Sequence, residues 1–330
     1  MVRVGVVGTN WITDHLLDAA KFVENFELAA VYSRTSERAK EFADKYGAQH
    51  TFTNLEEMAE SPLIDAVYIA TPNCYHEEQA ILFLQNGKHV LCEKPLAANA
   101  EEVKRMIEAA KKHNVLLMEA MKSTLLPNFK VIQENLHKIG PVRKFFSSYC
   151  QYSSRYDKYK EGIILNAFNP VYANGSLMDL GTYCLYPLIV LFGEPKGIQA
   201  TSVMLESGVD GEGSVLLQYD DKEAVVMYSK ISNSHLPSEI QGENGSLIID
   251  KLHTAERVEV RYNDGTVEHL TVEQPYPTMY YEVNEFVELI VNGKTESDVN
   301  SYHHSYETMK VMDEVRKIIG LVYPSDQKNK

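Results

Sequence analysis

The first 120 residues alternate between short apolar segments and longer amphipathic ones. Residues 2–7, 65–70 and 89–92 are almost continuously apolar, as expected for parallel strands that are buried on both faces. Residues 36–46 and 99–113 carry apolar side chains at helical spacing. Strands that alternate with helices in this way predict an α/β fold with a doubly wound parallel sheet.

After residue 127 the pattern changes, because strand-like segments follow one another without helices between them. This predicts an α+β domain with a largely antiparallel open sheet, and we place the two domains at residues 1–121 and 122–330. One face of that sheet has no obvious helical cover, so we expect a homodimer or homotetramer that forms through it. The predicted strands are residues 198–206, 213–219, 224–232, 237–241, 246–250 and 256–262, and the predicted helices are 177–191, 278–291 and 301–319.

Composition narrows the class of protein. Of 330 residues, 44% are hydrophobic and 24% charged, and the formal net charge is −14. An acidic chain repels phosphate backbones, which argues against nucleic acid or an anionic membrane as a partner. The four cysteines lie far apart without metal-ligand spacing, so we predict no metal site. No apolar run approaches the length of a membrane span, and we expect a cytoplasmic protein.

The turn after the first strand resembles a dinucleotide-binding fingerprint. Gly8 follows the strand, and a helical pattern with Leu16, Leu17, Ala20 and Val23 comes after the turn. Asn10 and Thr13 stand where the second and third glycines of that fingerprint belong. Asparagine tolerates left-handed backbone angles, so the turn can still form. Bulk at these positions opposes close approach of a pyrophosphate.

The end of the second strand predicts which cofactor binds. An NAD site carries an acidic residue here, whereas this chain has Ser33-Arg34. A hydroxyl and a guanidinium would bind a 2′-phosphate, so we predict NADP rather than NAD. Alternatively, Ser33 caps the next helix and Arg34 is solvated.

Polar residues also follow the later parallel strands, where ligands of α/β sheets bind. Lys94 stands directly after residues 89–92, between Glu93 and Pro95. His76 falls on the first turn of a helix near the same edge, and a satisfied surface or helix-start histidine is an equal alternative to a cofactor contact. The predicted cofactor-binding residues are Gly8, Thr9, Asn10, Trp11, Ile12, Ser33, Arg34, Arg38, Thr71, Pro72, Asn73, His76, Glu93 and Lys94.

The apolar helix at residues 177–191 contains Asp179 and Tyr183. Four residues apart, they share one face of an α-helix. A carboxylate and a phenol would be costly if buried without partners. Either they face a polar cleft, or Tyr183 belongs to the core and Asp179 bonds to backbone.

Together these motifs resemble the glucose–fructose oxidoreductase/inositol dehydrogenase family, often written Gfo/Idh/MocA, over nearly the whole chain. The motifs that carry the resemblance are the degenerate Gly8 turn, Ala70-Thr71-Pro72-Asn73 with His76, Glu93-Lys94-Pro95, and Asp179-x-Gly181-x-Tyr183. Within the family the pattern is most similar to the dihydrodiol and xylose dehydrogenase branch, which uses NADP. The family's Lys-Pro bond is often cis, and we predict the same here.

The resemblance implies an NADP-dependent dehydrogenase acting on a hydroxyl or carbonyl carbon of a sugar, polyol or diol. Lys94, Asp179 and Tyr183 would be its catalytic residues, with Lys94 and Tyr183 as the acid/base pair. A phenol titrates near 10, and an ammonium nearby favours the phenolate. Two alternatives are a non-redox sugar-processing enzyme that uses bound nicotinamide transiently, and a non-catalytic NADP-binding sensor.

Overall fold

The computed structural model describes residues 1–327, which form two compact units. The first unit contains Met1–Lys122 and Tyr276–Tyr306, and the second contains Ser123–Pro275 and the chain from Glu307 onward. A segment far downstream in the sequence thus folds with the N-terminal unit. The domain boundary at residue 121 remains a prediction.

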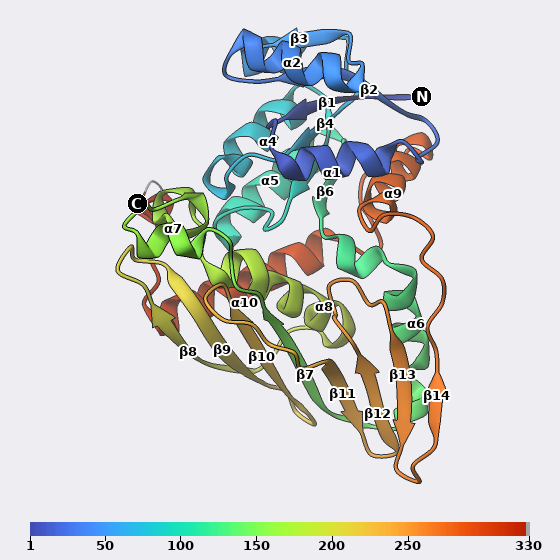
Figure 1. Ribbon diagram of the computed structural model, residues 1–330. Coiled ribbons are helices and arrows are strands. Elements are labelled where there is room, and N and C mark those ends of the chain that lie inside the picture. Colours follow the sequence, from blue (N-terminus) through green and yellow to red (C-terminus); the bar gives the residue numbers. More distant parts are fainter. Residues whose placement is uncertain (328–330) are drawn as a thin grey trace. The chain divides into compact units, whose positions relative to one another are not determined.

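The first unit is built on a six-stranded parallel sheet (Figure 1). Its strands are β1 (Val2–Val7), β2 (Phe26–Tyr32), β3 (His50–Phe52), β4 (Ala66–Ile69), β5 (His89–Glu93) and β6 (Leu117–Ala120). Their order, β3-β2-β1-β4-β5-β6, confirms the predicted doubly wound sheet. The order reverses between β1 and β4, which is where ligands of such sheets bind.

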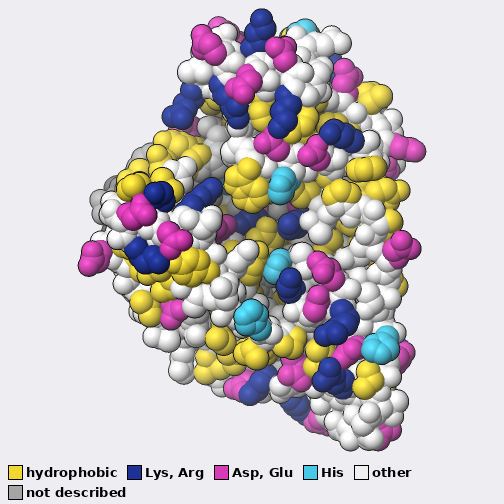
Figure 2. All heavy atoms as spheres, in the orientation of Figure 1, with side chains coloured by type: hydrophobic (Ala, Val, Ile, Leu, Met, Phe, Trp, Pro, Cys, Tyr) yellow, Lys and Arg dark blue, Asp and Glu magenta, His cyan; other side chains and the backbone are white. Residues whose placement is uncertain are grey.

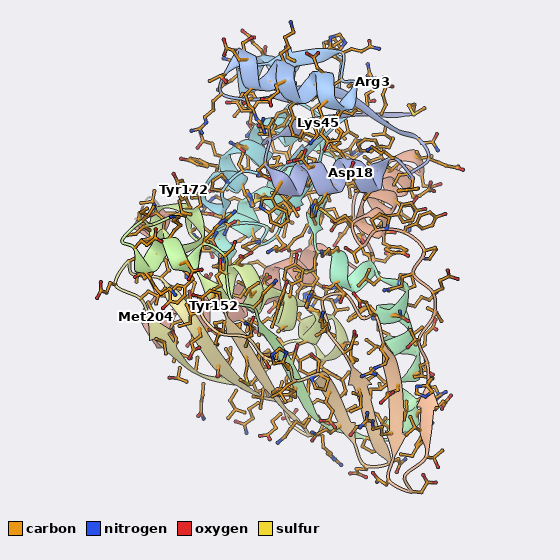
Figure 3. The ribbon with its side chains drawn as sticks, in the orientation of Figure 1. Arg3, Asp18, Lys45, Tyr152, Tyr172 and Met204 are labelled. Atoms are coloured by element: carbon orange, nitrogen blue, oxygen red, sulfur yellow. The ribbon has the colours of Figure 1, made fainter. Side chains whose placement is uncertain are left out.

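Amphipathic helices cover this sheet. They are α1 (Trp11–Ala20), α2 (Ser36–Tyr46), α3 (Leu55–Glu60), α4 (His76–Gln85), α5 (Ala100–His113) and α9 (Tyr280–Val291). In α5 the buried residues Val103, Met106, Ile107 and Ala110 follow helical spacing. Helix α4 packs on α5, and α1 on α9. Lys45 of α2, labelled in Figure 3, reaches Asp14 of α1 at 2.7 Å.

The second unit contains an eight-stranded sheet. Its strands are β7 (Val142–Cys150), β8 (Gly197–Met204), β9 (Asp210–Gln218), β10 (Glu223–Ser229), β11 (Ser238–Gly242), β12 (Gly245–Ile249), β13 (Val258–Tyr262) and β14 (Val267–His269). Their order is β14-β13-β12-β11-β7-β10-β9-β8. The pairings are antiparallel except for β7 with β10, so the predicted largely antiparallel sheet is confirmed.

One face of this sheet is covered and the other is open. In β10, Ala224, Val226 and Tyr228 are buried, while Val225 and Met227 between them are half-buried. The covered face packs against a π-helical turn, η6 (Leu177–Gly181), and the helix that continues it, α8 (Thr182–Phe192). Alternating burial is the pattern of a sheet with one solvated face.

Further helices complete the fold. The α-helices are α6 (Pro127–Asn135), α7 (Tyr156–Lys160) and α10 (Tyr302–Ile319). The short 3₁₀ turns among the described residues are η1 (Asn73–Tyr75), η2 (Lys122–Leu125), η3 (Leu136–Ile139), η4 (Asn166–Phe168), η5 (Pro170–Tyr172) and η7 (Pro324–Gln327).

One helical stretch among the described residues, Pro170–Phe192, has the length and apolar composition of a membrane-crossing helix. The sequence pattern predicted no apolar run of that length. Within the stretch, 72% of the most apolar window is buried inside the structure. The apolar composition of this stretch is therefore that of a helix buried in the protein core.

Charged side chains are mixed on the surface. On the face drawn in Figure 2, lysine and arginine side chains lie among aspartate and glutamate side chains. Exposed pairs such as Arg143 with Glu243, at 2.5 Å, are examples of this mixing. The acidic excess of the chain is therefore not gathered into one patch on that face.

Candidate active site

The turn after β1 depends on Gly8. Its φ of +110° is one that side-chain-bearing residues rarely adopt, and a Cβ there would lie 2.7 Å from the Ala70 carbonyl oxygen. Asn10, by contrast, has extended backbone angles of −105° and 178°. The expectation that Asn10 needs left-handed tolerance is therefore wrong.

Asn10 is the N-cap of α1. Its Oδ1 accepts from the Ile12 and Thr13 amides at 3.0 and 3.4 Å, and its Nδ2 donates to the Ala70 carbonyl at 2.7 Å. The buried Thr13 hydroxyl donates to the Gly8 carbonyl at 2.7 Å. Both departures from the glycine fingerprint thus stabilise the turn itself.

This helix start still fits a pyrophosphate. In residues 1–327 the backbone amides of Asn10 and Trp11 have no hydrogen-bond partner, although the next two amides are capped. Free amides at a helix N-terminus bind anions, and Gly8 lets a ligand approach the backbone. The first turn therefore has donors for a dinucleotide phosphate.

An arginine lies against the same turn. Arg38 donates to the Thr9 carbonyl at 2.7 Å and to the Thr9 hydroxyl at 3.2 Å, and it pairs with Glu41 at 2.8 Å. The cap of α2 is Thr35, whose hydroxyl accepts from the Arg38 amide, so the alternative of a Ser33 cap is wrong. Arg34 is exposed. Arg38 is thus the arginine that the structure places on the Gly8–Asn10 turn.

His76 ties two strand-end loops together. It is fully buried, with Nδ1 at 3.0 Å from the Pro95 carbonyl oxygen and Nε2 at 2.8 Å from that of Thr71. Burial lowers the pKa of His76, against the effect of these backbone hydrogen bonds. His76 is the first residue of α4 and both ring nitrogens face backbone oxygens, so the satisfied helix-start histidine fits, whereas a surface histidine does not. A cofactor contact by His76 remains a prediction.

The other polar residues after β4 lie nearby in the chain. The Thr71 hydroxyl donates to Gln79 Oε1 at 2.7 Å, Pro72 precedes η1 with extended backbone angles, and Asn73 is buried. Like His76, they are held at the carboxyl edge of the sheet. Their contact with a cofactor stays a prediction.

The Glu93-Lys94-Pro95 segment ends β5, and its Lys94–Pro95 bond is cis, as predicted. Glu93 is buried and accepts from the Tyr68 hydroxyl at 2.5 Å. Burial raises the pKa of Glu93, while the Tyr68 hydrogen bond and the charge of Lys94 oppose that rise. The Glu93 carboxyl group is therefore buried next to Lys94 in the chain and is hydrogen-bonded to Tyr68.

Two further buried carboxyl groups surround this segment, and the sequence analysis missed both. Glu119, at the end of β6, accepts from the Leu96 amide at 3.0 Å, and burial raises the pKa of Glu119 to about 7. Glu282 of α9 is fully buried, and neither carboxyl oxygen has a hydrogen-bond partner among the described residues. Burial, then the charge of Glu93, raises the pKa of Glu282, while Lys122 and Lys94 oppose the rise.

The sequence did contain a signal for Glu119. It lies at the carboxyl end of β6, the strand that follows β5 in the chain, and ligands of parallel sheets bind at the carboxyl ends of the strands. Glu282 had no such signal. It lies in a distant helix that folding brings back to the first unit.

The helix of Asp179 and Tyr183 begins at a buried cap. Asp210 of β9 accepts from the Ser176 and Leu177 amides at 3.1 and 2.6 Å. A Cβ on Gly181 would lie 3.0 Å from a ring carbon of Tyr228 in β10, so glycine lets this helix approach the sheet closely. The residues from Leu177 to Gly181 form a π-helical turn, so the α-helical spacing that we assumed for Asp179 does not apply there. Such turns are frequent at functional sites.

Asp179 and Tyr183 have partners that the sequence did not predict. Asp179 forms an ion pair of 2.6 Å with Lys230, which follows β10. The Tyr183 ring lies edge-on to Tyr149, with 5.6 Å between centroids, and 6.2 Å from the ring of His253. Tyr149 and His253 stack at 3.8 Å. Asp179 thus has a charged side-chain partner that neither alternative predicted.

The structure thus groups the predicted residues in two sets. The cofactor candidates and Lys94 belong to the first unit, and Asp179 and Tyr183 to the second. Within residues 1–327, no group of three or more histidine, cysteine, aspartate or glutamate side chains could hold a metal ion.

Two protein-family models match the chain, one in its N-terminal part and one in its C-terminal part. Residues 2–121 match the model for the oxidoreductase family with an NAD-binding Rossmann fold, and residues 134–248 match the GFO/IDH/MocA C-terminal domain. The chain belongs to the Gfo/Idh/MocA oxidoreductase family. This confirms the resemblance carried by the motifs, and the protein is an NAD(P)-dependent oxidoreductase.

Known relatives of this Gfo/Idh/MocA protein align over its whole length. It is 57% identical over 327 residues to scyllo-inositol 2-dehydrogenase (NADP(+)) IolU of Bacillus subtilis, covering 99% of this chain and 100% of the relative. It is 32% identical to trans-1,2-dihydrobenzene-1,2-diol dehydrogenase of Mus musculus, covering 99% of each.

Solved structures share the fold at lower identity. Aldose-aldose oxidoreductase from Caulobacter crescentus, complexed with glycerol, superposes with a TM-score of 0.84 at 22% identity, over 96% of this chain and 97% of the other. Levoglucosan dehydrogenase, complexed with NADH and levoglucosan, gives 0.82 at 22%, over 97% of each. The two-unit architecture is therefore that of known oxidoreductases.

We expect Glu119→Gln to flatten the dependence of stability on pH. The pKa of Glu119 is about 7 in the folded state and near 4.5 when unfolded, so the folded protein binds the extra proton between these values. The free energy of unfolding therefore falls as pH rises through this window, by about 3 kcal/mol from this group. Urea unfolding of both proteins at pH 5 and pH 8 measures the difference.

The exposed Glu108→Gln, on α5, is the matched control and should keep the parent's pH dependence. If Glu119→Gln loses as much stability between pH 5 and pH 8 as the parent does, Glu119 does not bind a proton in that range.

Proposed function

We propose that the protein is an NADP-dependent dehydrogenase of cyclic polyols, with inositols as the substrate class. The observation that carries this proposal is the 57% identity, over the full length of both chains, to scyllo-inositol 2-dehydrogenase (NADP(+)). The second relative acts, by its name, on a cyclic vicinal diol. A six-membered ring with neighbouring hydroxyls is common to both substrates.

The rings around Tyr183 support a cyclic substrate. Tyr183, Tyr149 and the half-buried His253 form one aromatic cluster. A cyclitol with equatorial hydroxyls presents C–H bonds on its ring faces and hydroxyls at its rim. Aromatic side chains suit such faces, while the carboxylate of Asp179 accepts hydrogen bonds from rim hydroxyls.

Each catalytic candidate has a proposed task. When bound, the nicotinamide supplies the hydride acceptor for oxidation and the hydride donor for reduction. Tyr183 takes the proton from the reacting hydroxyl or returns it to the carbonyl oxygen. Lys94 favours the phenolate form of Tyr183 through its positive charge, which makes the phenol a better base near neutral pH. Asp179 orients the substrate by accepting a hydroxyl.

Residues of the first unit would hold the cofactor. The Gly8 turn and the amides of Asn10 and Trp11 fit the pyrophosphate, with Thr9 and Ile12 beside them. We propose that Arg38, together with Ser33 and Arg34, binds the 2′-phosphate of NADP. Arg38 supports this because its guanidinium already lies on Thr9.

We expect Lys94→Ala and Tyr183→Phe each to reduce kcat for NADP-linked oxidation of scyllo-inositol by about 100-fold or more, because each removes a group from the proton transfer. NADPH binding, followed by its fluorescence, should change less than threefold for Tyr183→Phe. NADPH absorbance against a panel of inositols, sugars and vicinal diols measures turnover.

Normal turnover in either variant would contradict these roles. Product formed without net NADPH change would instead support the non-redox alternative. NADPH binding without turnover of any compound in the panel would support the sensor.

We expect Arg38→Ala to weaken NADP binding about tenfold or more while changing NAD binding little, because the lost charge-assisted hydrogen bonds serve the 2′-phosphate. Arg34 lies just before α2, and Arg34→Ala should also weaken NADP binding more than NAD binding, but by a smaller factor. Titration of NADP and NAD into both variants measures the two affinities. Equal weakening of both cofactors would contradict a 2′-phosphate site at Arg38.

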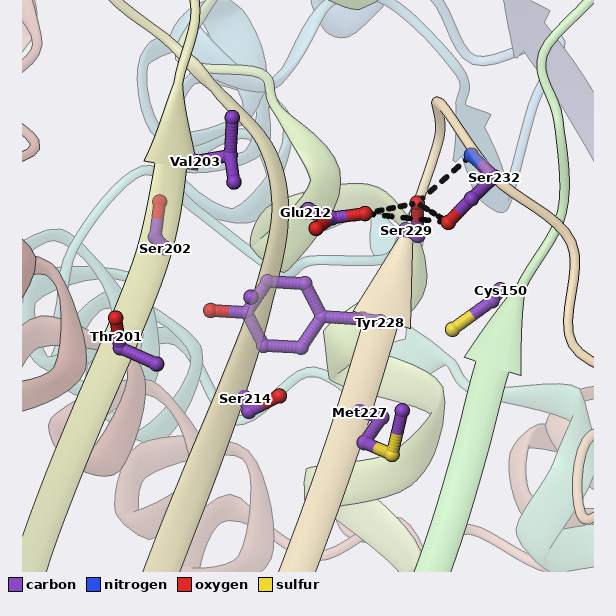
Figure 4. Close-up of a pocket in the computed structure, with 11 residues that line it drawn as sticks. Cys150, Thr201, Ser202, Val203, Glu212, Ser214, Met227, Tyr228, Ser229 and Ser232 are labelled. Atoms are coloured by element: carbon purple, nitrogen blue, oxygen red, sulfur yellow. Dashed lines mark hydrogen bonds between the residues drawn. The ribbon is translucent and has the colours of Figure 1, made fainter.

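We also propose that the open face of the eight-stranded sheet joins two copies of the chain. Val203 and Leu216 are 49 and 38% exposed there, and Met204, labelled in Figure 3, follows Val203 at the end of β8. Next to them, a shallow cavity of about 160 Å³ opens among β7, β8, β9 and β10 (Figure 4). Its rim contains Glu212, which accepts hydrogen bonds from Ser229 and Ser232. Exposed apolar residues with a polar rim are typical of an interface.

We expect Leu216→Lys to shift the protein to a smaller oligomer, because a charge would be desolvated in the interface. Size-exclusion chromatography with light scattering measures the mass. Val291→Lys, at an exposed position of α9, is the matched control and should keep the parent's mass. A parent that is monomeric, or an unchanged Leu216→Lys mass, would contradict the interface.

The cytoplasm is the compartment that we propose. Cys92, Cys150 and Cys184 are free thiols. Free thiols are typical of a reducing compartment.

A further inference from the structure

A buried lysine stands behind the proposed substrate-binding carboxylate. Lys230 is 3% exposed, and its Nζ lies 2.6 Å from Asp179 Oδ2. Its backbone is held on both sides, since its amide donates to the Gly211 carbonyl at 2.9 Å and its carbonyl accepts from the Ser153 amide at 2.8 Å. The Phe168 ring lies 5.7 Å from the ammonium. Lys230 therefore has little freedom to move.

Burying an ammonium is costly unless negative charge and hydrogen bonds compensate it. Asp179 supplies one carboxylate, and Asp210 on the neighbouring strand supplies a second. Burial raises the pKa of Asp210 to about 6, and the charge of Lys230 opposes that rise. Asp210 also caps the helix that carries Asp179. The start of the helix that carries Asp179 is therefore held to the sheet in two ways, by the Asp210 cap and by the Lys230–Asp179 ion pair.

The pairing has a chemical consequence at Asp179. This side chain is 38% exposed, so it is reachable, whereas its partner is not. An ionised carboxylate can accept several donors, so Asp179 can accept a hydroxyl in addition to the Lys230 ammonium. The ammonium keeps it ionised and restricts its rotation, so less ordering remains to be done when a substrate binds.

We propose that Lys230 is a positioning residue that fixes Asp179 to accept the hydroxyl next to the reacting carbon, so that the enzyme requires a vicinal diol. This inference rests on the proposed polyol dehydrogenase function. Lys230 does not touch the reacting atoms, and it acts through Asp179.

The test compares trans-1,2-cyclohexanediol with cyclohexanol in NADP-linked oxidation. The parent should prefer the diol. Lys230→Met should lower kcat/KM for the diol by about 10- to 100-fold, the range of a hydrogen bond to a charged group, and reduce the preference. Lys230→Arg, which keeps the charge, should retain most of the preference. Lys196→Met removes an exposed lysine that pairs with Asp220 at 2.6 Å and should match the parent.

A purely structural role of Lys230 predicts a different pattern. It would lower the melting temperature and reduce turnover of both alcohols equally, leaving the preference unchanged. That result would overturn the proposal. A parent that oxidises both alcohols equally well would also overturn it.

A double-mutant cycle keeps the test decisive even if Lys230→Met is poorly stable. Because Lys230 acts through Asp179, adding Lys230→Met to Asp179→Asn should cost little more kcat/KM for the diol than Asp179→Asn alone. Fully additive losses would overturn the proposal. If instead the parent oxidises no polyol at all with NADP, the proposed function itself fails, which is a distinct outcome.

Discussion

The carboxyl edge of the parallel sheet depends on side chains that hydrogen-bond to the backbone of neighbouring loops. Asn10 donates to the Ala70 carbonyl, and His76 lies between the carbonyls of Thr71 and Pro95. The loops after β1, β4 and β5 are thereby joined. These bonds hold the backbone of three strand-end loops, and a loop carbonyl left without a donor in the interior would be costly.

Buried carboxyl groups create the second constraint. Glu93, Glu119 and Glu282 all belong to the first unit and all are nearly inaccessible to solvent. Burial raises the pKa of each, and the charge of Lys94 opposes the rise in each case. The lysine is therefore electrostatically coupled to its surroundings before any ligand binds. Strongly perturbed groups of this kind concentrate at functional sites.

In the second unit, close packing decides where the polar groups lie. Gly181 lets the helix approach Tyr228, and Asp210 caps the helix start from the sheet. Lys230 then meets Asp179 at ion-pair distance. The contacts that pack the helix on the sheet also fix the positions of the Asp179 carboxylate and the Lys230 ammonium.

The sequence by itself determined the fold class and the strand-end position of Lys94 through local periodicity, and its short motifs carried the resemblance to the family. The cis bond before Pro95 was implied by that resemblance. The sequence could not predict Asn10 as a cap, Arg38 on Thr9, or the partners Lys230 and Glu282. Each of those depends on residues distant in the chain or on side-chain direction. Periodicity encodes which face of an element is buried. Which side chains meet on a buried face is decided only when the elements pack. A buried charge needs a partner, and that partner can come from a distant part of the chain that only the tertiary structure brings close.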